Sequence, residues 1–318
     1  MDEEKRYLTY SDYLKNKYGE KVYKLPVNLP GTCPNRDDFI GSGGCIFCAE
    51  EGSGFDLLPN SLAIKEQIEK NKKYFSQRFK AKKFIVYYQA FTNTYWPLDK
   101  FKSFVEVSGE VEDVVEVSVS TRPDCISDNY LDVLKALSEN KDLDINVELG
   151  LQTVNYHTLE KINRGHTLAE FVDAVKRNKE RGFSTCAHLI INLPWDDMND
   201  IVECAKLMSA LEVEQVKLHS LYIVDGTALG EMYKNNEFEV ISLDEYVERV
   251  VNFIEHLSSD IVIQRLVGKG PKDKLLFNNW DRSWWHIKER IEKTLQEINT
   301  WQGKKCNYLN GKALKKFQ

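Results

Sequence analysis

The sequence contains no apolar run approaching the ~18 residues that a helix needs to cross a bilayer. Its first residues, Met-Asp-Glu-Glu-Lys-Arg-Tyr, lack the apolar region of a secretory signal peptide. No low-complexity segment and no Pro- or Gly-rich linker divides the chain. We therefore expect a cytoplasmic protein with no membrane partner. Its 318 residues suffice for one large α/β barrel or two modest domains.

A second pair of closely spaced metal ligands is also missing. Cys45 and Cys48 form a C-x-x-C pair, and neither another such pair nor an H-x-x-x-H motif accompanies it. Structural zinc usually takes four protein ligands, so a zinc ribbon, the alternative to the interpretation below, would need a ligand from elsewhere. A disulfide framework is disfavoured because the seven cysteines are odd in number and the chain is long.

What the sequence does contain is a third cysteine, Cys33, twelve positions before the pair. The glycines between them, Gly41, Gly43 and Gly44, allow the connecting loop to close over a metal centre. Three thiolates with no fourth partner nearby predict a centre with one open coordination position. Iron–sulfur clusters are normally held by cysteine thiolates, and a cubane cluster can leave one iron free for another ligand.

The charge is unevenly distributed. A net charge of −6 argues against general affinity for nucleic acid. Residues 70–83, however, carry seven basic side chains and no acidic one, and residues 304–316 carry five lysines and no acidic residue. Such patches can bind RNA phosphates, and the alternative is a solvated helix face and tail. The candidate RNA-binding residues are Lys72, Lys73, Arg78, Lys80, Lys82 and Lys83.

Short β-like runs alternate with amphipathic helical patterns through most of the chain. The predicted strands are 22–27, 84–88, 114–120, 145–151, 185–192, 216–221 and 261–266. This alternation predicts a parallel sheet, and six or more strand–helix units favour a partial or near-complete parallel (βα) barrel. We expect the barrel over residues 1–225. A C-terminal strand–helix extension, with its Lys-rich tail, then packs on the barrel over residues 226–318.

Helix boundaries are also readable. Thr167 with Glu170, and Ser242 with Glu245, form capping-box patterns at helix starts. The spacing of the apolar residues in the last helix predicts a core face. That face comprises Trp284, Ile287, Ile291, Leu295 and Ile298.

Several candidate residues lie in the last part of a predicted strand or just after it. Because the active sites of such barrels lie at the C-terminal ends of the strands, we expect these residues to point at one mouth. They include Gln89, Thr92, Asn93, Arg122, Glu148, Gln152, His188, Asn192 and Leu221.

The loop Cys45-Ile-Phe47-Cys48 resembles the cluster loop of the radical S-adenosylmethionine (radical SAM) enzymes, in which the residue at the Phe47 position lies against the adenine. The long spacing from Cys33 is similar to that of the Elongator catalytic subunit and the bacterial YhcC/YtqA-like (MnmL-like) family. Three further segments resemble the radical SAM domain of the Elongator subunit. They are Ser-Thr-Arg-Pro-Asp at 120–124, Glu-Leu-Gly-Leu-Gln-Thr at 148–153 and Asn-Arg-Gly-His-Thr at 163–167.

This resemblance implies a [4Fe–4S] cluster on Cys33, Cys45 and Cys48. S-adenosylmethionine would bind the open iron and be cleaved to methionine and a 5′-deoxyadenosyl radical. The electron would come from a donor such as flavodoxin or ferredoxin. The resemblance also implies tRNA as the substrate, with aminomethyluridine-type maturation of the wobble uridine. The alternatives are a radical enzyme acting on a small molecule or peptide, and a non-catalytic metal-binding protein.

Residues for binding S-adenosylmethionine follow from the same resemblance. Arg122 and Arg164 are candidates for the methionine carboxylate, since Arg can bind a carboxylate through two hydrogen bonds. Glu148 and Gln152 are candidates for the ribose. The alternatives are an ion pair with Asp124 for Arg122 and a strand-paired carboxylate for Glu148. The full candidate set is Phe47, Gln89, Thr92, Asn93, Arg122, Glu148, Gln152, Arg164, His188, Asn192 and Leu221.

Two departures from the Elongator pattern stand out. Residues 87–94 read Tyr-Tyr-Gln-Ala-Phe-Thr-Asn-Thr where the pattern usually has Gly-Gly-Glu. The residue that would bind the amino group of the cofactor is therefore not identified. Trp195 stands where glycine is expected, so the shape of the substrate site at that loop differs.

Overall fold

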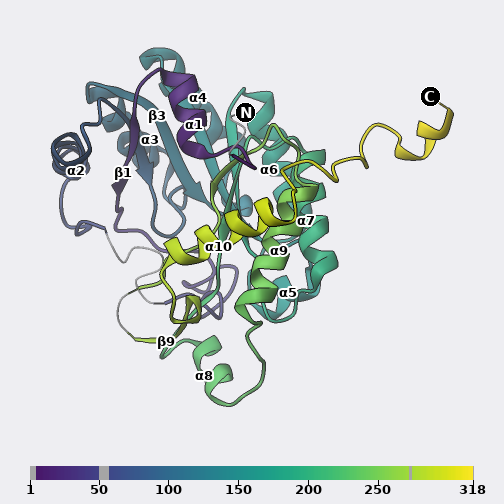
Figure 1. The fold of residues 1–318 in the computed structure, drawn as a ribbon. Helices are drawn as coiled ribbons and strands as arrows, with labels where there is room; N and C mark the ends of the chain where they lie inside the picture. The colour runs from purple at the N-terminus through teal and green to yellow at the C-terminus, as the bar shows by residue number, and fades with distance from the viewer. Residues whose placement is uncertain (1–4, 50–56, 272–273, 318) are drawn as a thin grey trace. The chain divides into compact units, whose positions relative to one another are not determined.

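The computed structural model describes residues 5–49, 57–271 and 274–317. Seven parallel strands form a curled half-barrel sheet in the order β1-β2-β3-β4-β5-β6-β8, and helices alternate with them (Figure 1). The chain divides into two compact units. We call Ser11–Leu151 with Glu160–Cys186 the cysteine unit, and Met1–Tyr10, Gln152–Leu159 and Ala187–Gln318 the C-terminal unit.

The cysteine unit contains the first half of the sheet. Its elements are α1 (Tyr10–Tyr18), β1 (Val22–Val27), α2 (Ile64–Phe79), β2 (Lys83–Tyr88), α3 (Leu98–Glu106), η1 (Val107–Glu110), β3 (Val114–Thr121), η2 (Pro123–Cys125), α4 (Asp128–Lys141), β4 (Asp144–Gln152), α6 (Leu168–Glu180) and β5 (Ser184–Ile190), the last of which continues into the C-terminal unit. β1 to β4 pair in parallel, so Leu25 lies opposite Val86, and both are fully buried. α2 packs beside β1 (Figure 1).

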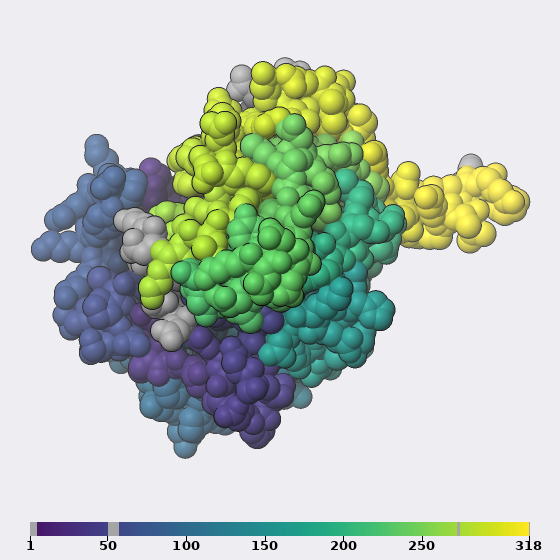
Figure 2. All heavy atoms as spheres, turned by 90° about the horizontal axis from the view of Figure 1, so that it is seen from below, coloured from purple at the N-terminus to yellow at the C-terminus, as the bar shows by residue number. Residues whose placement is uncertain are grey.

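The C-terminal unit contains the remaining elements. They are α5 (Tyr156–Lys161), α7 (Met198–Ala210), β6 (Gln215–His219), β7 (Tyr222–Val224), α8 (Ala228–Lys234), α9 (Leu243–His256), β8 (Val262–Arg265), β9 (Leu275–Asn278), η3 (Asn279–Asp281), α10 (Trp284–Glu297) and η4 (Lys312–Phe317). β8 pairs in parallel with β6, and β7 pairs antiparallel with β9. α9 packs against α7 and α10. The Lys-rich tail extends away from these helices (Figures 1 and 2).

All seven predicted strands are confirmed, with ends within two residues of those observed. The sequence analysis missed β7 and β9, which are three and four residues long and form a separate two-stranded sheet. Runs this short carry too little alternation to be recognised. The domain boundary at residue 225 stays a prediction.

The core face of α10 is shorter than predicted. Ile287, Ile291 and Leu295 are fully buried, whereas Trp284 is 37% and Ile298 54% exposed. These two residues stand at the first position and the C-cap of the helix, where its packing surface ends.

Gln302 connects the ends of the chain within the C-terminal unit. Its Oε1 accepts from the Leu8 backbone N–H at 2.9 Å, and its Nε2 donates to the carbonyls of Ser258 and Ile261 at 2.6 and 2.7 Å. The side chain is 2% exposed, so these bonds satisfy a buried amide.

The capping box of α6 is confirmed and permits a stability test. Thr167 accepts from the Glu170 N–H, while the Glu170 carboxylate accepts from the Thr167 N–H at 2.6 Å. We expect Thr167→Ala to lower the free energy of unfolding by about 1 kcal/mol, because an orphan helix donor loses its partner. Thr294→Ala is the control, because the half-buried Thr294 lies inside α10 and its hydroxyl donates to the Arg290 carbonyl without capping a helix end. Chemical denaturation measures both, and equal effects would contradict the capping role.

Candidate cluster and cofactor site

The three cysteines lie in one loop of tight turns. The Arg36 N–H donates to the Cys33 carbonyl at 2.8 Å, and the Cys48 N–H donates to the Cys45 carbonyl at 2.9 Å. Cys45 is buried, and Cys33 and Cys48 are half-buried. Burial and the neighbouring Cys45 thiolate raise the pKa of the Cys48 thiol to about 11. Three thiol groups gathered out of water, with mutual repulsion between their anionic forms, suit a cationic metal centre.

Two guanidinium groups contact the sulfur atoms. Nη1 of Arg164 lies 3.5 Å from Sγ of Cys45, and Nη1 of Arg122 lies 3.9 Å from Sγ of Cys33. The same Nη1 of Arg122 donates to the Arg164 carbonyl at 2.8 Å. Both arginines are buried, so their positive charge acts on the cysteines with little solvent screening.

Arg164 also joins the second and third Elongator-like segments of the sequence analysis, 148–153 and 163–167. Its Nε and Nη2 donate to the Gly150 carbonyl at 3.2 and 2.7 Å, and Nε also donates to Nε2 of His166 at 2.8 Å. Burial and the charge of Arg164 lower the pKa of His166 to about 3, so the ring is neutral and can accept this bond. Together with Arg122, these contacts connect all three segments at the cysteine loop.

Asn35 was not identified from the sequence, although it lies only two positions after Cys33. Its Nδ2 donates to the Asn163 carbonyl at 2.5 Å and lies 3.8 Å from Sγ of Cys45. Gly165 permits this approach: its φ is +77°, and an added Cβ would stand 2.9 Å from the Asn35 side-chain oxygen. A larger residue at 165 would therefore displace Asn35 from the cysteine loop.

Arg122 forms the ion pair that the sequence analysis gave as its alternative role. Nε and Nη2 donate to the two carboxylate oxygens of Asp124 at 2.8 and 2.7 Å, and the side chains are 2% and 5% exposed. Burial alone would raise the pKa of Asp124, but the bonds from Arg122 outweigh it and lower the pKa. The role of Arg122 in binding the methionine carboxylate stays a prediction.

Glu148 is fully buried and forms an ion pair with Lys24 of β1. The Lys24 ammonium also lies 4.5 Å from the centroid of the Tyr87 ring. The sequence analysis missed Lys24, because a single lysine inside a strand carries no local signal. The assignment of Glu148 to the ribose stays a prediction.

The loop after β2 is tied to its neighbours by the backbone. The Gln89 N–H donates to the Val27 carbonyl at 3.2 Å, and the Thr92 N–H donates to the Thr32 carbonyl in the cysteine loop at 3.4 Å. Nδ2 of Asn93 donates to the Tyr88 and Ser120 carbonyls at 3.0 and 2.8 Å. Its Oδ1 is buried and has no hydrogen-bond partner among the described residues.

The remaining candidates lie in the C-terminal unit, apart from the half-buried Phe47. Asn192 and Leu221 are joined, since Oδ1 of Asn192 accepts from the Leu221 N–H at 2.7 Å. Nδ2 of Asn192 is buried without a partner in the described part of the chain. The His188 ring lies 5.2 Å from that of His219, and Gln152 takes a left-handed conformation with φ of 78°.

The loop around Trp195, the second departure from the Elongator pattern, is well packed. The Trp195 ring lies 5.7 Å from that of Phe238. Asp196 is 4% exposed, and burial raises the pKa of its carboxyl to about 6. The hydroxyls of Thr153 and Thr158 lie near this carboxyl. Neither carboxylate oxygen of Asp196, however, has a hydrogen-bond partner among the described residues.

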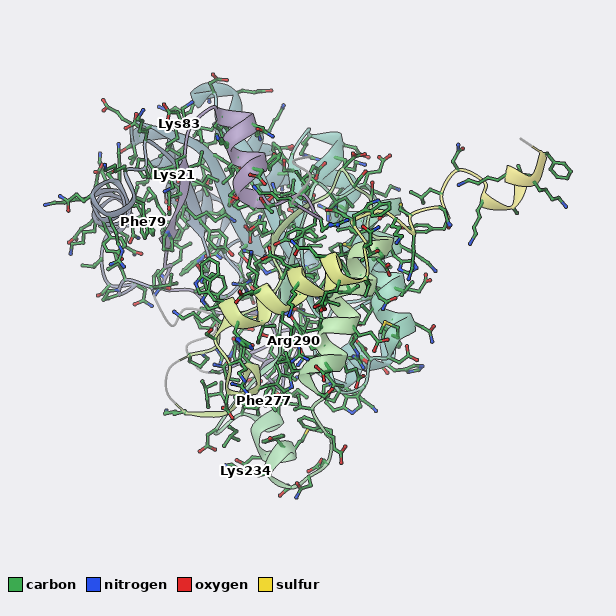
Figure 3. The ribbon with its side chains drawn as sticks, viewed as in Figure 1. Lys21, Phe79, Lys83, Lys234, Phe277 and Arg290 are labelled. Carbon is green, nitrogen blue, oxygen red and sulfur yellow. The ribbon has the colours of Figure 1, made fainter. Side chains whose placement is uncertain are left out.

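The basic segment divides into two groups. Lys72 pairs with Asp113 at 3.1 Å, Lys82 pairs with Glu20 at 2.9 Å, and Lys83 donates to the Tyr18 carbonyl at 2.9 Å. In contrast, Lys73, Arg78 and Lys80 are exposed along the second half of α2 and at its C-cap, and none forms an ion pair within the described ranges. Figure 3 shows Phe79, the last residue of α2, with Lys21, whose ammonium donates to the Phe79 carbonyl at 3.4 Å.

No helix in the described part of the chain is long and apolar enough to cross a membrane.

The comparisons with known proteins agree with this geometry. The family model of the radical SAM superfamily matches residues 29–208, and that of the radical SAM C-terminal domain matches residues 213–297. The chain therefore belongs to the radical SAM superfamily, whose members use a [4Fe–4S] cluster and S-adenosylmethionine.

Its similar relatives place it in the YhcC/YtqA-like family. The chain is 35% identical to the uncharacterized protein YtqA of Bacillus subtilis over 95% of this chain and 93% of that one. It is 31% identical to protein YhcC of Escherichia coli, over 89% and 90%.

More distant relatives match in part. The tRNA uridine(34) acetyltransferase of Methanocaldococcus jannaschii is 28% identical over 42% of this chain and 24% of that protein. The solved structure of Methanocaldococcus infernus Elp3 gives a TM-score of 0.67 at 16% identity, over 88% of this chain and 64% of that chain. This structural likeness shows the fold alone.

The role of Arg122 can be tested directly. We expect Arg122→Ala to weaken S-adenosylmethionine binding by about 1.5–3 kcal/mol, the worth of a hydrogen bond to a charged group, with the cluster retained. Because the change leaves Asp124 buried without its partner, the double variant Arg122→Ala/Asp124→Asn is the control for stability. Calorimetry on the reconstituted protein measures the affinity. Unchanged affinity in both variants would mean that Arg164 or backbone groups bind the methionine carboxylate of the cofactor.

Proposed function

We propose that this radical SAM enzyme modifies the side chain of the wobble uridine in tRNA, in an aminomethyluridine-type maturation. The observation that carries the proposal is the hydrogen-bonded connection of Arg122, Arg164 and Gly150 at the cysteine loop. These residues belong to the segments that resemble the radical SAM domain of the Elongator subunit. The partial match to a tRNA uridine(34) acetyltransferase supports the same substrate class.

In this proposal Cys33, Cys45 and Cys48 hold the [4Fe–4S] cluster. The donor set fits, because the three sulfurs share one loop and two buried guanidinium groups offset the negative charge of thiolates. When bound, the cluster and S-adenosylmethionine would supply the radical chemistry that removes a hydrogen atom from the substrate. An electron donor such as flavodoxin or ferredoxin completes the system.

The protein's own residues bind, orient and exclude water. Arg122 and Arg164 keep positive charge beside the cysteines, and Asn35 orients the loop through Asn163. Oδ1 of Asn93, a buried polar atom of the cysteine unit without a partner among the described residues, is suited to a hydrogen bond with a bound cofactor.

Mass spectrometry of nucleosides from the tRNA of a deletion strain tests this function. We expect one modified wobble uridine to disappear and its precursor to accumulate, and expression of the wild-type chain to restore it. A Cys48→Ala chain is the matched control and should not restore it. An unchanged nucleoside profile would favour the alternative, a radical enzyme acting on a small molecule or peptide.

A further inference from the structure

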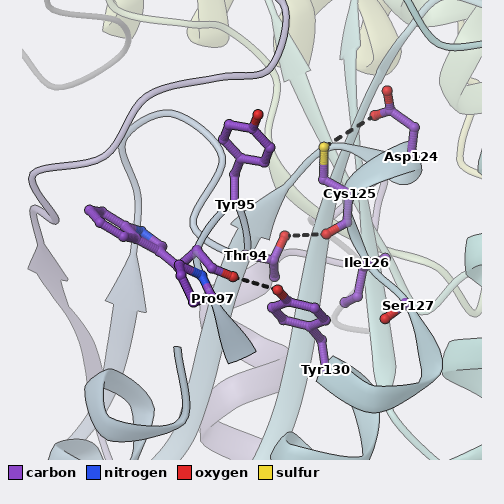
Figure 4. A pocket seen from close by; sticks show the side chains of 9 residues that line it. Thr94, Tyr95, Pro97, Asp124, Cys125, Ile126, Ser127 and Tyr130 are labelled. Carbon is purple, nitrogen blue, oxygen red and sulfur yellow. Dashed lines mark hydrogen bonds between the residues drawn. The ribbon is translucent and has the colours of Figure 1, made fainter. Parts of the chain in front are cut away.

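A cavity of about 510 Å³ opens in the cysteine unit at the ends of β2 and β3. Its wall comes from the residues after β2, Thr94 to Pro97, and from the residues after β3, Asp124 to Ser127, together with Tyr130 of α4. Its size falls within the range of small-molecule binding sites. Figure 4 shows Tyr95 across the cavity from Cys125 and Asp124, with Thr94 between Tyr95 and Tyr130.

Aromatic rings form much of this wall. Tyr95, Trp96 and Tyr130 line the cavity, and each ring is only half-buried, so its surface is available for a ligand. The Tyr130 hydroxyl donates to the Trp96 carbonyl, which holds the two loops together. Partly exposed aromatic rings that are held in place suit a planar ligand, and base–aromatic stacking is tolerant of base identity.

The opposite wall is polar and adjoins the cysteine loop. The Asp124 carboxylate lines the cavity while it accepts two hydrogen bonds from Arg122, which in turn contacts Sγ of Cys33. Oδ1 also accepts from the Cys125 thiol at 3.7 Å, whereas Oδ2 accepts only from Arg122 among the described residues and retains acceptor capacity for a ligand N–H. A molecule bound to Asp124 would therefore be separated by Arg122 alone from Cys33, which is predicted to bind the cluster.

Two helices begin at the rim of the cavity. α3 begins after Pro97 and α4 begins after Ser127, and neither residue caps its helix with a side chain. The positive ends of two helix dipoles therefore lie at the rim. Lys100, in the first turn of α3, has its ammonium 4.2 Å from the centroid of the Trp96 ring. The first turns of these helices also carry Asp99 and Asp128, so the rim has mixed charge.

We propose that this cavity binds an unpaired nucleobase of the RNA substrate, stacked on Tyr95 and Tyr130 and hydrogen-bonded to Asp124. The inference rests on the proposed function and adds to it the place where the RNA approaches the cluster loop. Single-stranded RNA is recognised in this way, through unstacked bases that lie on aromatic side chains and form hydrogen bonds at their edges.

Photo-crosslinking tests the proposal on the reconstituted full chain. The probe is an anticodon stem-loop RNA with one 4-thiouridine in its loop, and peptide mapping locates the crosslink. We expect crosslinks to fall within residues 94–97 and 124–130. Tyr95→Leu removes a stacking ring, and Ser127→Trp fills the cavity from an exposed position on the rim. We expect each variant to lower the crosslink yield roughly tenfold, because each prevents one base from stacking on an aromatic ring.

Tyr156→Leu is the matched control, because Tyr156 is 53% exposed and does not line the cavity. It should leave the yield unchanged, and iron content and circular dichroism verify that all three variants are folded. A crosslink that the two cavity variants do not diminish overturns the proposal.

Three further outcomes identify what has failed. RNA that binds but crosslinks elsewhere overturns the cavity proposal and leaves the proposed function standing. RNA that does not bind at all, measured by anisotropy, overturns the proposed function and the cavity proposal with it. If S-adenosylmethionine suppresses the crosslink and Ser127→Trp abolishes S-adenosylmethionine binding, the cavity holds the cofactor's adenine and the RNA proposal is wrong.

Discussion

Replacing Cys33, Cys45 or Cys48 with Ala should abolish the cluster of the anaerobically reconstituted protein. We expect about four irons per wild-type chain, with the charge-transfer absorption of a cubane cluster. Each cysteine supplies one thiolate from the same loop. The other cysteine that contacts this network, Cys125, lies beyond Asp124, with its Sγ 3.7 Å from Oδ1 of that residue. The loop of residues 31–48 therefore contains no further cysteine that could replace a lost cluster ligand.

Cys204→Ala is the matched control for the cluster. Cys204 is 2% exposed in α7 of the C-terminal unit, so its replacement removes a buried thiol of similar size without touching the cysteine loop. Iron analysis and absorption spectra should match those of the wild type. Full iron content in any one of the three loop variants would disprove the assignment of that cysteine as a ligand.

Reversing the charges of Lys73, Arg78 and Lys80 to Glu should weaken tRNA binding across tRNA species. These three side chains are exposed along the second half of α2 and at its C-cap. The Arg78 guanidinium lies over the rings of Tyr74 and Phe79, at 5.8 and 5.5 Å from their centroids. Each RNA phosphate that the variant no longer neutralises should reduce the slope of log affinity against log salt by roughly 0.7 to 0.9. The cluster and basal cleavage of S-adenosylmethionine should be spared.

The control is a triple reversal with the same change of net charge elsewhere on the unit. Lys135 and Lys141 of α4 and Lys176 of α6 lie outside the basic segment. Anisotropy titrations at two salt concentrations compare the two triple variants with the wild type. Equal weakening by both would mean that only net charge matters. If the wild type binds no tRNA even at low salt, the small-molecule radical enzyme becomes the better account.

Much of the fold was predictable because its signals are local. The predicted strand at 22–27 has the same ends as β1, since its apolar run is bounded by polar turns on both sides. The capping box of Thr167 and Glu170 is likewise a pattern of four consecutive residues. The pairing partner of Arg122 was predictable only as an alternative, because Asp124 is close in sequence while the contacts with Cys33 and Arg164 are not.

By itself the sequence determined the three cysteines, the strand–helix alternation and the superfamily, because spacing and periodicity are properties of neighbouring residues. Only the tertiary structure decided which charges are paired. It placed Lys24 on Glu148 and Lys72 on Asp113, and it left Lys73 exposed within the same basic segment. The partners are tens of residues apart in sequence, so whether a charge is paired depends on how the strands and helices pack together.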